Sequence, residues 1–260
     1  MNMFTYNNHM LLNALQGVVR RRILVNFKVD PAVIRRHVPA PFELQLVDGW
    51  SIAGICLIRL EHMRPPRLPE AVGIASDNAA HRIAVTWPDR AGRTCTGVFI
   101  PRRDTASPLN ALVGGRLFPG EHQRARFLVQ DDGDTIDLAM RTADGRGDVR
   151  LRAHAADRLP GTSVFPSMAA ASEFFAAGSA GYSATAAAGL HGLELRTLAW
   201  RLEPLAVELV RSSYFAYFPE GSVAFDSALL MRDIPHEWHA LPSLTPAAAQ
   251  APLLFGRTGQ

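Results

Sequence analysis

The 260-residue chain is short of cysteine and has no long apolar run. Its two cysteines, Cys56 and Cys95, make no disulfide framework, and we expect both as reduced thiols in strands. The longest strongly apolar stretch, Ser51 to Leu60, has about half the length of a membrane span. The start, Met1 to Gly17, lacks the basic head and apolar middle of a secretory signal. We therefore expect a cytoplasmic protein with no membrane partner.

Lysine is almost missing, because Lys28 is the only one and the other 26 basic residues are arginine. The formal net charge is only +3, and no basic run is longer than Arg20 to Arg22. Aromatic residues do not interleave with that run, so nucleic acid is not an expected partner. There is no glycine-rich phosphate loop or nucleotide fingerprint, and the Asp-rich turns at 131–134 and 144–147 lack the spacing of a calcium loop. We expect no cofactor and no metal.

An apolar content of 48% is ample for a packed core, and the order of apolar residues predicts many strands and few helices. Period-two alternation or continuous apolar character predicts strands over 19–27, 51–60, 83–87, 94–100, 125–129, 135–142, 149–154, 193–202 and 205–215. Helices are expected from Asp30 to Arg36, from Ser107 to Gly114 and from Ser167 to Ala177. The proline cluster at 64–69 must be an ordered loop.

No repeat and no linker divides the sequence. These features predict a β-rich α+β fold in a single domain over residues 1–242, with a mobile start over 1–17 and a loose tail over 243–260. The pattern lacks the alternating helices of a doubly wound sheet.

Polar groups interrupt the strand pattern at four places where an apolar or turn residue would suffice. Arginine at a strand end presents a rigid fork of donors that matches a carboxylate, and histidine can move a proton near neutral pH. Converging groups of this kind suit an acidic or carbonyl-bearing small molecule. Alternatively, Arg102 or Arg103 pairs with Asp104, and Arg82 lies on a solvent face. The four places are Asn78 with His81 and Arg82; Arg102 to Thr105; Arg116; and Glu121 to Arg124, which includes His122 and Gln123.

Several of these segments resemble a known superfamily. Residues 114–124 resemble the part of acetoacetate decarboxylases in which Gly-Arg-Glu is followed by Pro-Lys-Lys, and residues 203–219 are similar to the end of the same proteins. Segments 77–82, 97–105 and 225–227 resemble an uncharacterised bacterial family assigned to that fold. The resemblance covers roughly residues 20–240. It implies a curved sheet or cone-shaped barrel around a cavity, with a few short helices, and it favours a homo-oligomer.

The resemblance departs at the residue that carries the decarboxylase chemistry. In that enzyme a lysine of depressed pKa forms a Schiff base with the keto acid, as is known for acetoacetate decarboxylase. The residue count from Arg116 places Gln123 at the lysine and Arg124 beside it, and Leu117 replaces the glutamate. Neither an amide nor a guanidinium can form an imine. Lys28, on the polar side of a strand, is not expected to be the nucleophile.

The resemblance therefore implies a pocket without the covalent step. We expect an enzyme, lyase- or isomerase-like, that acts on a keto or carboxylate compound by acid–base chemistry such as decarboxylation, enolisation, hydration or cyclisation. One alternative is a ligand-binding or structural member of the superfamily, and another is a metal hydrolase using His236 and His239. The expected catalytic residues are His81, His122 and Arg116, and the expected substrate-binding residues are Asn78, Arg82, Arg102, Arg103, Asp104 and Gln123.

Overall fold

A computed structural model describes residues 14–107, 120, 122–185 and 189–245, and strands dominate this part of the chain. The predicted β-rich α+β fold with few helices is confirmed. The helices are α1 (Pro31–Ile34), η1 (Arg35–His37), η2 (Glu70–Val72), α3 (Met168–Ala177) and α4 (Ser213–Ala216). The strands are β1 (Ala14–Val29), β2 (Glu43–Leu44), β3 (Leu46–Val47), β4 (Trp50–Arg64), β5 (Ile74–Pro88), β6 (Thr94–Thr105), β7 (His122–Asp131), β8 (Thr135–Thr142), β9 (Val149–Ala155), β10 (Ala180–Ala184), β11 (Leu190–Thr197), β12 (Glu203–Ser212) and β13 (Val223–Leu244).

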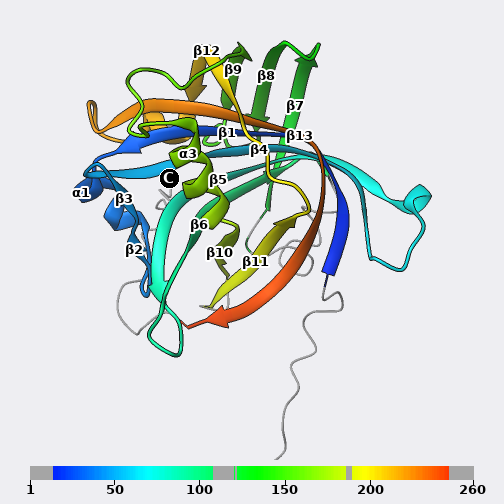
Figure 1. Ribbon diagram of the computed structural model, residues 1–260, viewed down its shortest axis with the longest axis horizontal. Helices are drawn as coiled ribbons and strands as arrows, with labels where there is room; N and C mark the ends of the chain where they lie inside the picture. Colours follow the sequence, from blue (N-terminus) through cyan, green and yellow to red (C-terminus); the bar gives the residue numbers. More distant parts are fainter. Residues whose placement is uncertain (1–13, 108–119, 121, 186–188, 246–260) are drawn as a thin grey trace, which may run out of the picture.

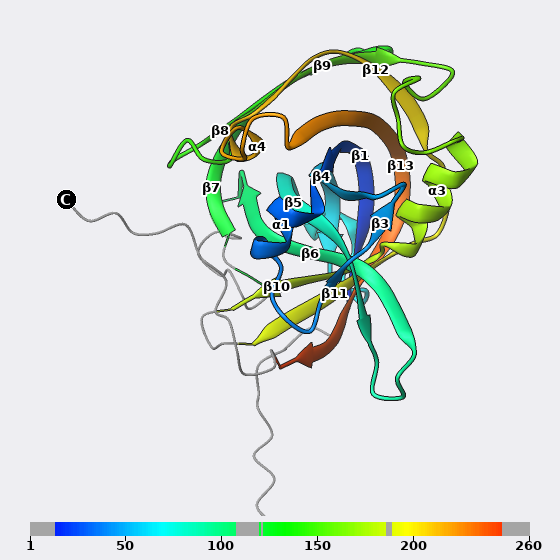
Figure 2. The same cartoon turned by 90° about the vertical axis from the view of Figure 1, so that its left-hand side faces the viewer.

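All described strands belong to one curved sheet that closes on itself twice. The order β11-β10-β6-β7-β8-β9-β12-β13-β1-β4-β5-β2 is supplemented by β5–β6 and β11–β13 pairings. One ring therefore runs through β10 and β11, the other through β7, β8, β9 and β12, and both share β13, β1, β4, β5 and β6. Figures 1 and 2 show the two sets of strands on opposite sides of the shared strands. Closure removes most of the unpaired sheet edges.

The shared strands are buried on both faces because a ring lies on each side of them. In β1, Ile23 and Val25 pack into the core beneath β8 and β9, whereas Leu24 packs into a second core with Phe165 and Phe175. The sequence predicts β1 as a half-buried strand, and the structure shows its inner part buried on both sides. The prediction that residues 51–60 are buried on both sides is confirmed.

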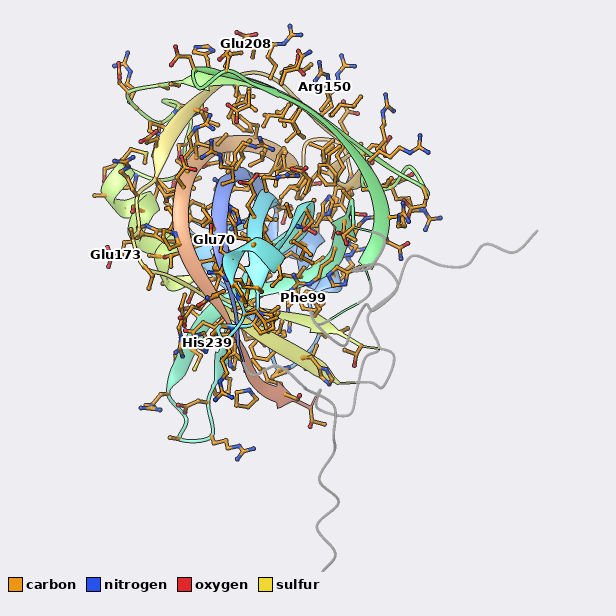
Figure 3. The ribbon with its side chains drawn as sticks, turned by 90° about the vertical axis from the view of Figure 1, so that its right-hand side faces the viewer. Glu70, Phe99, Arg150, Glu173, Glu208 and His239 are labelled. Carbon is orange, nitrogen blue, oxygen red and sulfur yellow. The ribbon has the colours of Figure 1, made fainter. Side chains whose placement is uncertain are left out.

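Helix α3 covers the second core. Ser167 caps it by accepting a hydrogen bond from the Ala170 backbone N–H (3.1 Å), as the sequence predicts. Its inner face buries Ala171 and Phe175. Glu173, labelled in Figure 3, lies on the outer side of the helix. No helix in the described ranges is long and apolar enough to cross a membrane.

The C-terminal part of the chain differs from the sequence prediction. Residues 205–215 were expected to form one strand, but β12 ends at Ser212, whose side chain caps α4. The first two residues of the tail expected over 243–260 are still strand, since β13 extends to Leu244 and pairs there with Leu190 of β11. The helix expected over 107–114 lies outside the described residues.

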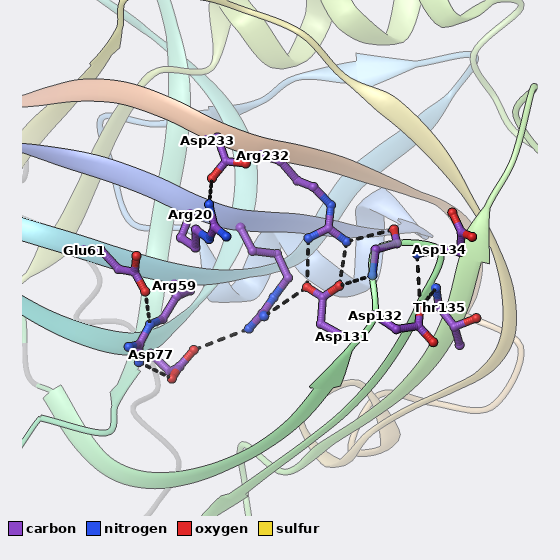
Figure 4. A network of polar contacts seen from close by, with 12 residues as sticks. Arg20, Arg59, Glu61, Asp77, Asp131, Asp132, Asp134, Thr135, Arg232 and Asp233 are labelled. Carbon is purple, nitrogen blue, oxygen red and sulfur yellow. Dashed lines mark hydrogen bonds and ion pairs between the residues drawn. The ribbon is translucent and has the colours of Figure 1, made fainter.

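Charged side chains fasten the β7–β8 turn to the shared strands (Figure 4). Asp131 accepts two hydrogen bonds from Arg232 (2.7 and 2.8 Å) and one from Arg21 (3.3 Å). Arg21 also reaches Asp77 at 3.4 Å, and Asp77 accepts from Arg59 at 2.9 Å. This network links β1, β4, β5, β7 and β13 with ion pairs that are mostly shielded from water.

Candidate functional site

A cavity of about 320 Å³ lies inside the ring that contains β10 and β11. Residues of β1, β4 and β5 form one wall, and residues of β6, β10, β11 and β13 form the other. Gly178 and Ser179, directly after α3, also border it. Most lining side chains are aliphatic or aromatic, so the few polar groups among them determine what the cavity can bind.

Strand parity brings the polar groups of β5, β6 and β7 to this cavity. Successive side chains of a strand point to opposite faces, and Arg82 lies two residues beyond Ala80 on β5. Arg103 of β6 is the antiparallel partner of Ala80 and the parallel partner of His122 on β7. Arg82, Arg103 and His122 thus lie on the cavity side of three neighbouring strands.

Four arginines border the cavity, and none has an acidic partner among the described residues. Arg64 lies at the outer end of β4, whereas Arg22, Arg82 and Arg103 lie further inside. Arg82 donates to Asn26 Oδ1 and lies over the Phe175 ring, with Cζ 4.9 Å from the ring centroid. Arg103 donates from Nε to Ser183 Oγ (3.2 Å). Arg22 donates only to sulfur, to Cys56 Sγ (3.3 Å) and Met231 Sδ (3.7 Å). No ion pair involves any of the three.

The unused donors of these arginines are buried. Arg82 is 7% exposed and Arg103 is 8% exposed, yet Arg82 Nε and Arg103 Nη2 have no hydrogen-bond partner in the described structure. Burial lowers the pKa of both guanidinium groups to about 10, which leaves them charged at neutral pH. A buried cation without a carboxylate is costly unless an anion joins it. The cavity is therefore suited to a small anion.

His122 is neutral in this setting. Burial, and then the positive charge of Arg103, lower the pKa of His122 to about 4. A neutral imidazole can accept a proton, and the protonated form would be destabilised by the neighbouring guanidinium. His122 therefore has the protonation state of a general base.

Asn78 borders the cavity between the arginines and the outer part of the cavity. Its amide donates to Ser76 Oγ (2.9 Å), and its oxygen accepts from Thr105 Oγ1 (2.7 Å). The amide nitrogen also donates to the Ser76 carbonyl (3.2 Å), so both of its hydrogens are used and Asn78 shapes the cavity wall.

The other predicted residues of β5 and β6 face the opposite side of the sheet. Arg102 binds Asp104 (2.7 and 3.0 Å) and Asp144 (2.8 and 2.9 Å), which is the pairing that the sequence left open as an alternative. His81 is fully buried, with Nδ1 3.7 Å from Asp104 Oδ2 and its ring 4.4 Å from Tyr214. Asp104 borders the cavity too, but its carboxylate belongs to this second cluster.

In the second cluster, the charge of Arg102 is balanced by Asp104 and Asp144. Burial, and then the charge of Arg102, lower the pKa of His81 to about 3, so its ring is neutral. Burial raises the pKa of Asp104 despite the hydrogen bonds from Arg102. The structure therefore separates His81, Arg102 and Asp104 from the Arg82, Arg103 and His122 group that lines the cavity.

Two further predicted residues contribute nothing to the described cavity wall. Gln123 is exposed on β7, next to His122 but on the other face of the strand. Arg116 lies outside the described residues. Lys28, the only lysine, donates to the Thr162 carbonyl (3.1 Å) and does not border the cavity.

Sequence reasoning missed Arg22 and Cys56 as cavity residues. Both alternate with core residues on long buried strands, so a pattern of apolar residues hides them. The signal that could have identified Arg22 is that neighbouring residues of a strand point to opposite faces. Arg21 points to the charge network, so Arg22 points to the cavity.

The two histidines considered for a metal lie on β13 rather than on a helix. Three residues apart on a strand, they point to opposite faces. His236 is buried at 1% exposure, whereas His239 pairs with Glu237 (2.7 Å). Within the described residues, no group of three or more metal-ligating side chains gathers at any point.

Residues 18–221 match the model of DUF2071, a family described as an uncharacterized conserved protein. The chain belongs to the DUF2071 family. A comparison with curated proteins finds no match.

Solved structures show the same fold at low sequence identity. Acetoacetate decarboxylase from Legionella pneumophila aligns at 11% identity over 94% of this chain and 93% of its own, with a TM-score of 0.58. An acetoacetate decarboxylase-like enzyme from Sphingomonas wittichii aligns at 15% identity over 93% and 98%, with a TM-score of 0.55. MppR, an enduracididine biosynthesis enzyme bound to the condensation product of pyruvate and imidazole 4-carboxaldehyde, aligns at 11% identity over 92% and 91%, with a TM-score of 0.57. This DUF2071 chain therefore has the acetoacetate decarboxylase-like fold that its segments resemble.

Proposed function

We propose that this chain is an enzyme that acts on a small keto or carboxylate compound by non-covalent acid–base chemistry. The observation that carries the proposal is the pair of buried arginines, Arg82 and Arg103, which face an apolar cavity with unused donors and no acidic partner in the described structure. Arginine forks match a carboxylate or an enolate oxygen. Arg116, outside the described residues, stays a predicted third contact.

The reaction that suits these groups is proton transfer next to a carbonyl. His122, neutral and on the strand beside Arg103, takes a proton from the carbon next to the carbonyl. The electrons of the broken C–H bond form the enolate, whose oxygen is held by Arg103 and Arg82. A fixed cation in a dry site stabilises such an oxyanion by several kcal/mol, and a positioned base contributes about 10²- to 10⁴-fold.

A Schiff-base route does not fit the position of the only lysine. Lys28 donates a hydrogen bond to the Thr162 carbonyl, and its Nζ lies over the Trp50 ring, 5.8 Å from the ring centroid. It does not border the cavity. The rate enhancement must then come from electrostatic stabilisation and proton transfer rather than from an imine. The competing proposal is a binding protein that uses the same arginines without turnover.

Proton exchange separates these two proposals. With 2-oxobutanoate in D₂O, we expect the wild-type chain to accelerate deuterium incorporation at C3, followed by NMR, and His122→Asn to lose most of that acceleration while retaining binding. Arg103→Gln should weaken binding about 10- to 100-fold, measured by calorimetry, because a charge-assisted hydrogen bond is lost.

The control is Lys28→Arg, which keeps the charge but cannot form an imine. It should retain exchange and binding, and borohydride should leave the wild-type chain unlabelled in the presence of the keto acid. Binding without exchange would favour the binding-protein alternative. Labelling at Lys28 would overturn the non-covalent mechanism.

A further inference from the structure

The cavity is long and has two chemically different ends. On β5, the cavity side carries Ile74, Ser76, Asn78, Ala80 and Arg82 in succession, and all five border the cavity. Ile74 is 44% exposed and Arg82 only 7%, so the row runs from the surface to the interior. The eight residue-to-residue steps from Ile74 to Arg82 span about 26 Å of strand. The arginines therefore lie at the inner end of an elongated site.

Strand β4 supplies a second, more apolar row beside the first. Cys56, Ile58 and Leu60 are the cross-strand partners of Ala80, Asn78 and Ser76, and after a bulge Met63 pairs with Ile74. The facing wall adds Ile100, Leu193, Leu195 and Trp238. Between its inner and outer ends the cavity thus offers a predominantly apolar channel.

The outer end is a mouth made by the segment between β4 and β5 and by the adjoining strand ends, and it is apolar except for Arg64. Leu68 (47% exposed), Val72 (56%) and Ile74 border the cavity while facing water. They are three of the seven large apolar side chains that are exposed in the described part of the chain. Such a cluster at a cavity mouth marks a binding surface rather than scattered surface residues.

This mouth has a defined shape. Arg64 donates from Nη1 to the His62 carbonyl (2.9 Å) and from Nε to the Leu68 carbonyl (3.1 Å). His62 Nδ1 also lies 3.4 Å from Glu70 Oε1. At Gly73 the backbone of His62 is so near that a Cβ would approach its Cα to 2.6 Å, so only glycine fits there. The bonds hold Leu68 and Val72 at the opening.

We propose that the ligand is an amphiphilic monoanion, a carboxylate with an extended apolar chain. Its carboxylate binds Arg82 and Arg103 at the inner end, and its chain follows the β4–β5 rows to Leu68, Val72 and Ile74. The volume of about 320 Å³ matches sites for ligands of drug size and exceeds what acetoacetate requires. This inference rests on the proposed function, because it takes the inner arginines to bind the anion.

A chain-length series tests the inference. Dissociation constants of butanoate, hexanoate, octanoate and decanoate, measured by calorimetry below micelle-forming concentrations, should fall about fourfold for each added methylene that the channel buries. Octanol should bind much more weakly than octanoate, because it lacks the charge for the inner arginines. Arg103→Gln should weaken all four carboxylates by a similar factor.

The mouth is tested by the double substitution Val72→Asn with Ile74→Asn. Both side chains are largely exposed, so the fold should tolerate the change, which circular dichroism checks. Hexadecanoate, long enough to extend from Arg103 to the mouth, should bind roughly tenfold more weakly to this variant, while butanoate, too short to reach the mouth, should be unaffected. The matched control is Leu128→Asn on β7, 74% exposed and away from the cavity, which should alter neither ligand.

If all four carboxylates bound with equal affinity and still required Arg103, the ligand would not be an amphiphile. The proposed function would then still stand. An unchanged hexadecanoate affinity in the mouth variant would likewise overturn the amphiphile and leave the proposed function standing. If no carboxylate bound to the wild-type chain, the proposed function itself would fail.

Discussion

Neighbouring residues of one strand have opposite roles in this protein. Arg102 is bound by two aspartates on one face of β6, and Arg103 points to the cavity on the other face without any acidic partner in the described structure. The sequence shows two adjacent arginines and cannot assign the faces, because the β5–β6 register shifts between His81 and Ile83. The alternation of side chains along one strand follows from its own sequence. A bulge, which changes the face that a residue presents, depends on the pairing with the neighbouring strand.

Replacing each arginine by methionine should separate the two roles. Arg102→Met leaves the fully buried carboxylate of Asp104 without its cation, so we expect the free energy of unfolding to fall by about 3–5 kcal/mol. Arg103→Met removes a cation that has no carboxylate partner, so stability should be unchanged or raised by about 1 kcal/mol. Urea unfolding with equal m-values measures both.

The comparison is decisive because the two residues share strand, length and charge. A loss in Arg103→Met as large as that in Arg102→Met would show that Arg103 is structural. Sequence reasoning did select Arg82, Arg103 and His122, since a polar residue in an apolar strand is conspicuous. It included His81 for the same reason, although His81 stacks on Tyr214 in the core.

At the scale of elements, local patterns predicted the strands well and their ends poorly. The strand over 135–142 was predicted from the alternation of its side chains, and the helix after Ser167 was predicted from its capping residue. Both signals lie within the segment itself. The 22-residue β13 was missed because it contains Pro235 and a left-handed residue, Asp233, with φ of 54°. Its continuity comes from pairing with β1, β11 and β12, which are distant in sequence.

The charge network between β7 and β13 should matter for the joining of these elements. Asp131→Asn removes the negative charge that pairs with Arg232 and one of the two that pair with Arg21, which is 8% exposed, so we expect a loss of about 1–3 kcal/mol in unfolding free energy. Asp233→Asn is the matched control, because its pair with Arg20 is more than half exposed and should contribute at most about 0.5 kcal/mol.

Thermal unfolding and urea titration both report this difference, and faster protease cleavage at the β7–β8 turn should accompany Asp131→Asn. Similar losses in the two variants would mean that burial does not strengthen the Asp131 network. High salt should weaken the exposed pair first.

The whole molecule combines two rings around a shared set of strands, and closure could not be derived from the alternation pattern. Periodicity identifies strands but not which distant strands pair. The neighbouring strands β5 and β6 are expected as a hairpin, but the β1–β13 and β6–β10 pairings, which the rings also need, join strands far apart in the sequence. The cavity was expected only through the resemblance to acetoacetate decarboxylases. The same closure buries His81 and His236 and partly buries His122, so global stability becomes dependent on pH.

These histidines predict acid destabilisation that begins above the range of the carboxylates. Burial, with nearby arginine charge, lowers the pKa of His81 to about 3 and the pKa values of His122 and His236 to about 4. In the unfolded chain each histidine binds a proton near pH 6.5. Neither state is protonated above that pH, so the histidines contribute nothing there. As the pH falls, only the unfolded state gains protons until the folded pKa is reached.

Stability should therefore drop between pH 6.5 and 5 by about 1.4 kcal/mol per pH unit for each such histidine, measured by urea unfolding at constant salt. His81→Phe keeps a ring against Tyr214 but cannot be protonated, so the slope should decrease by the equivalent of one proton. His154→Gln, at the surface beside Glu208, controls for the loss of an imidazole. An unchanged slope in His81→Phe would mean that His81 takes up its proton equally in both states. The core beside Asp104 and Tyr214 would then tolerate a charged imidazole, contrary to the full burial of His81 and to its lowered pKa.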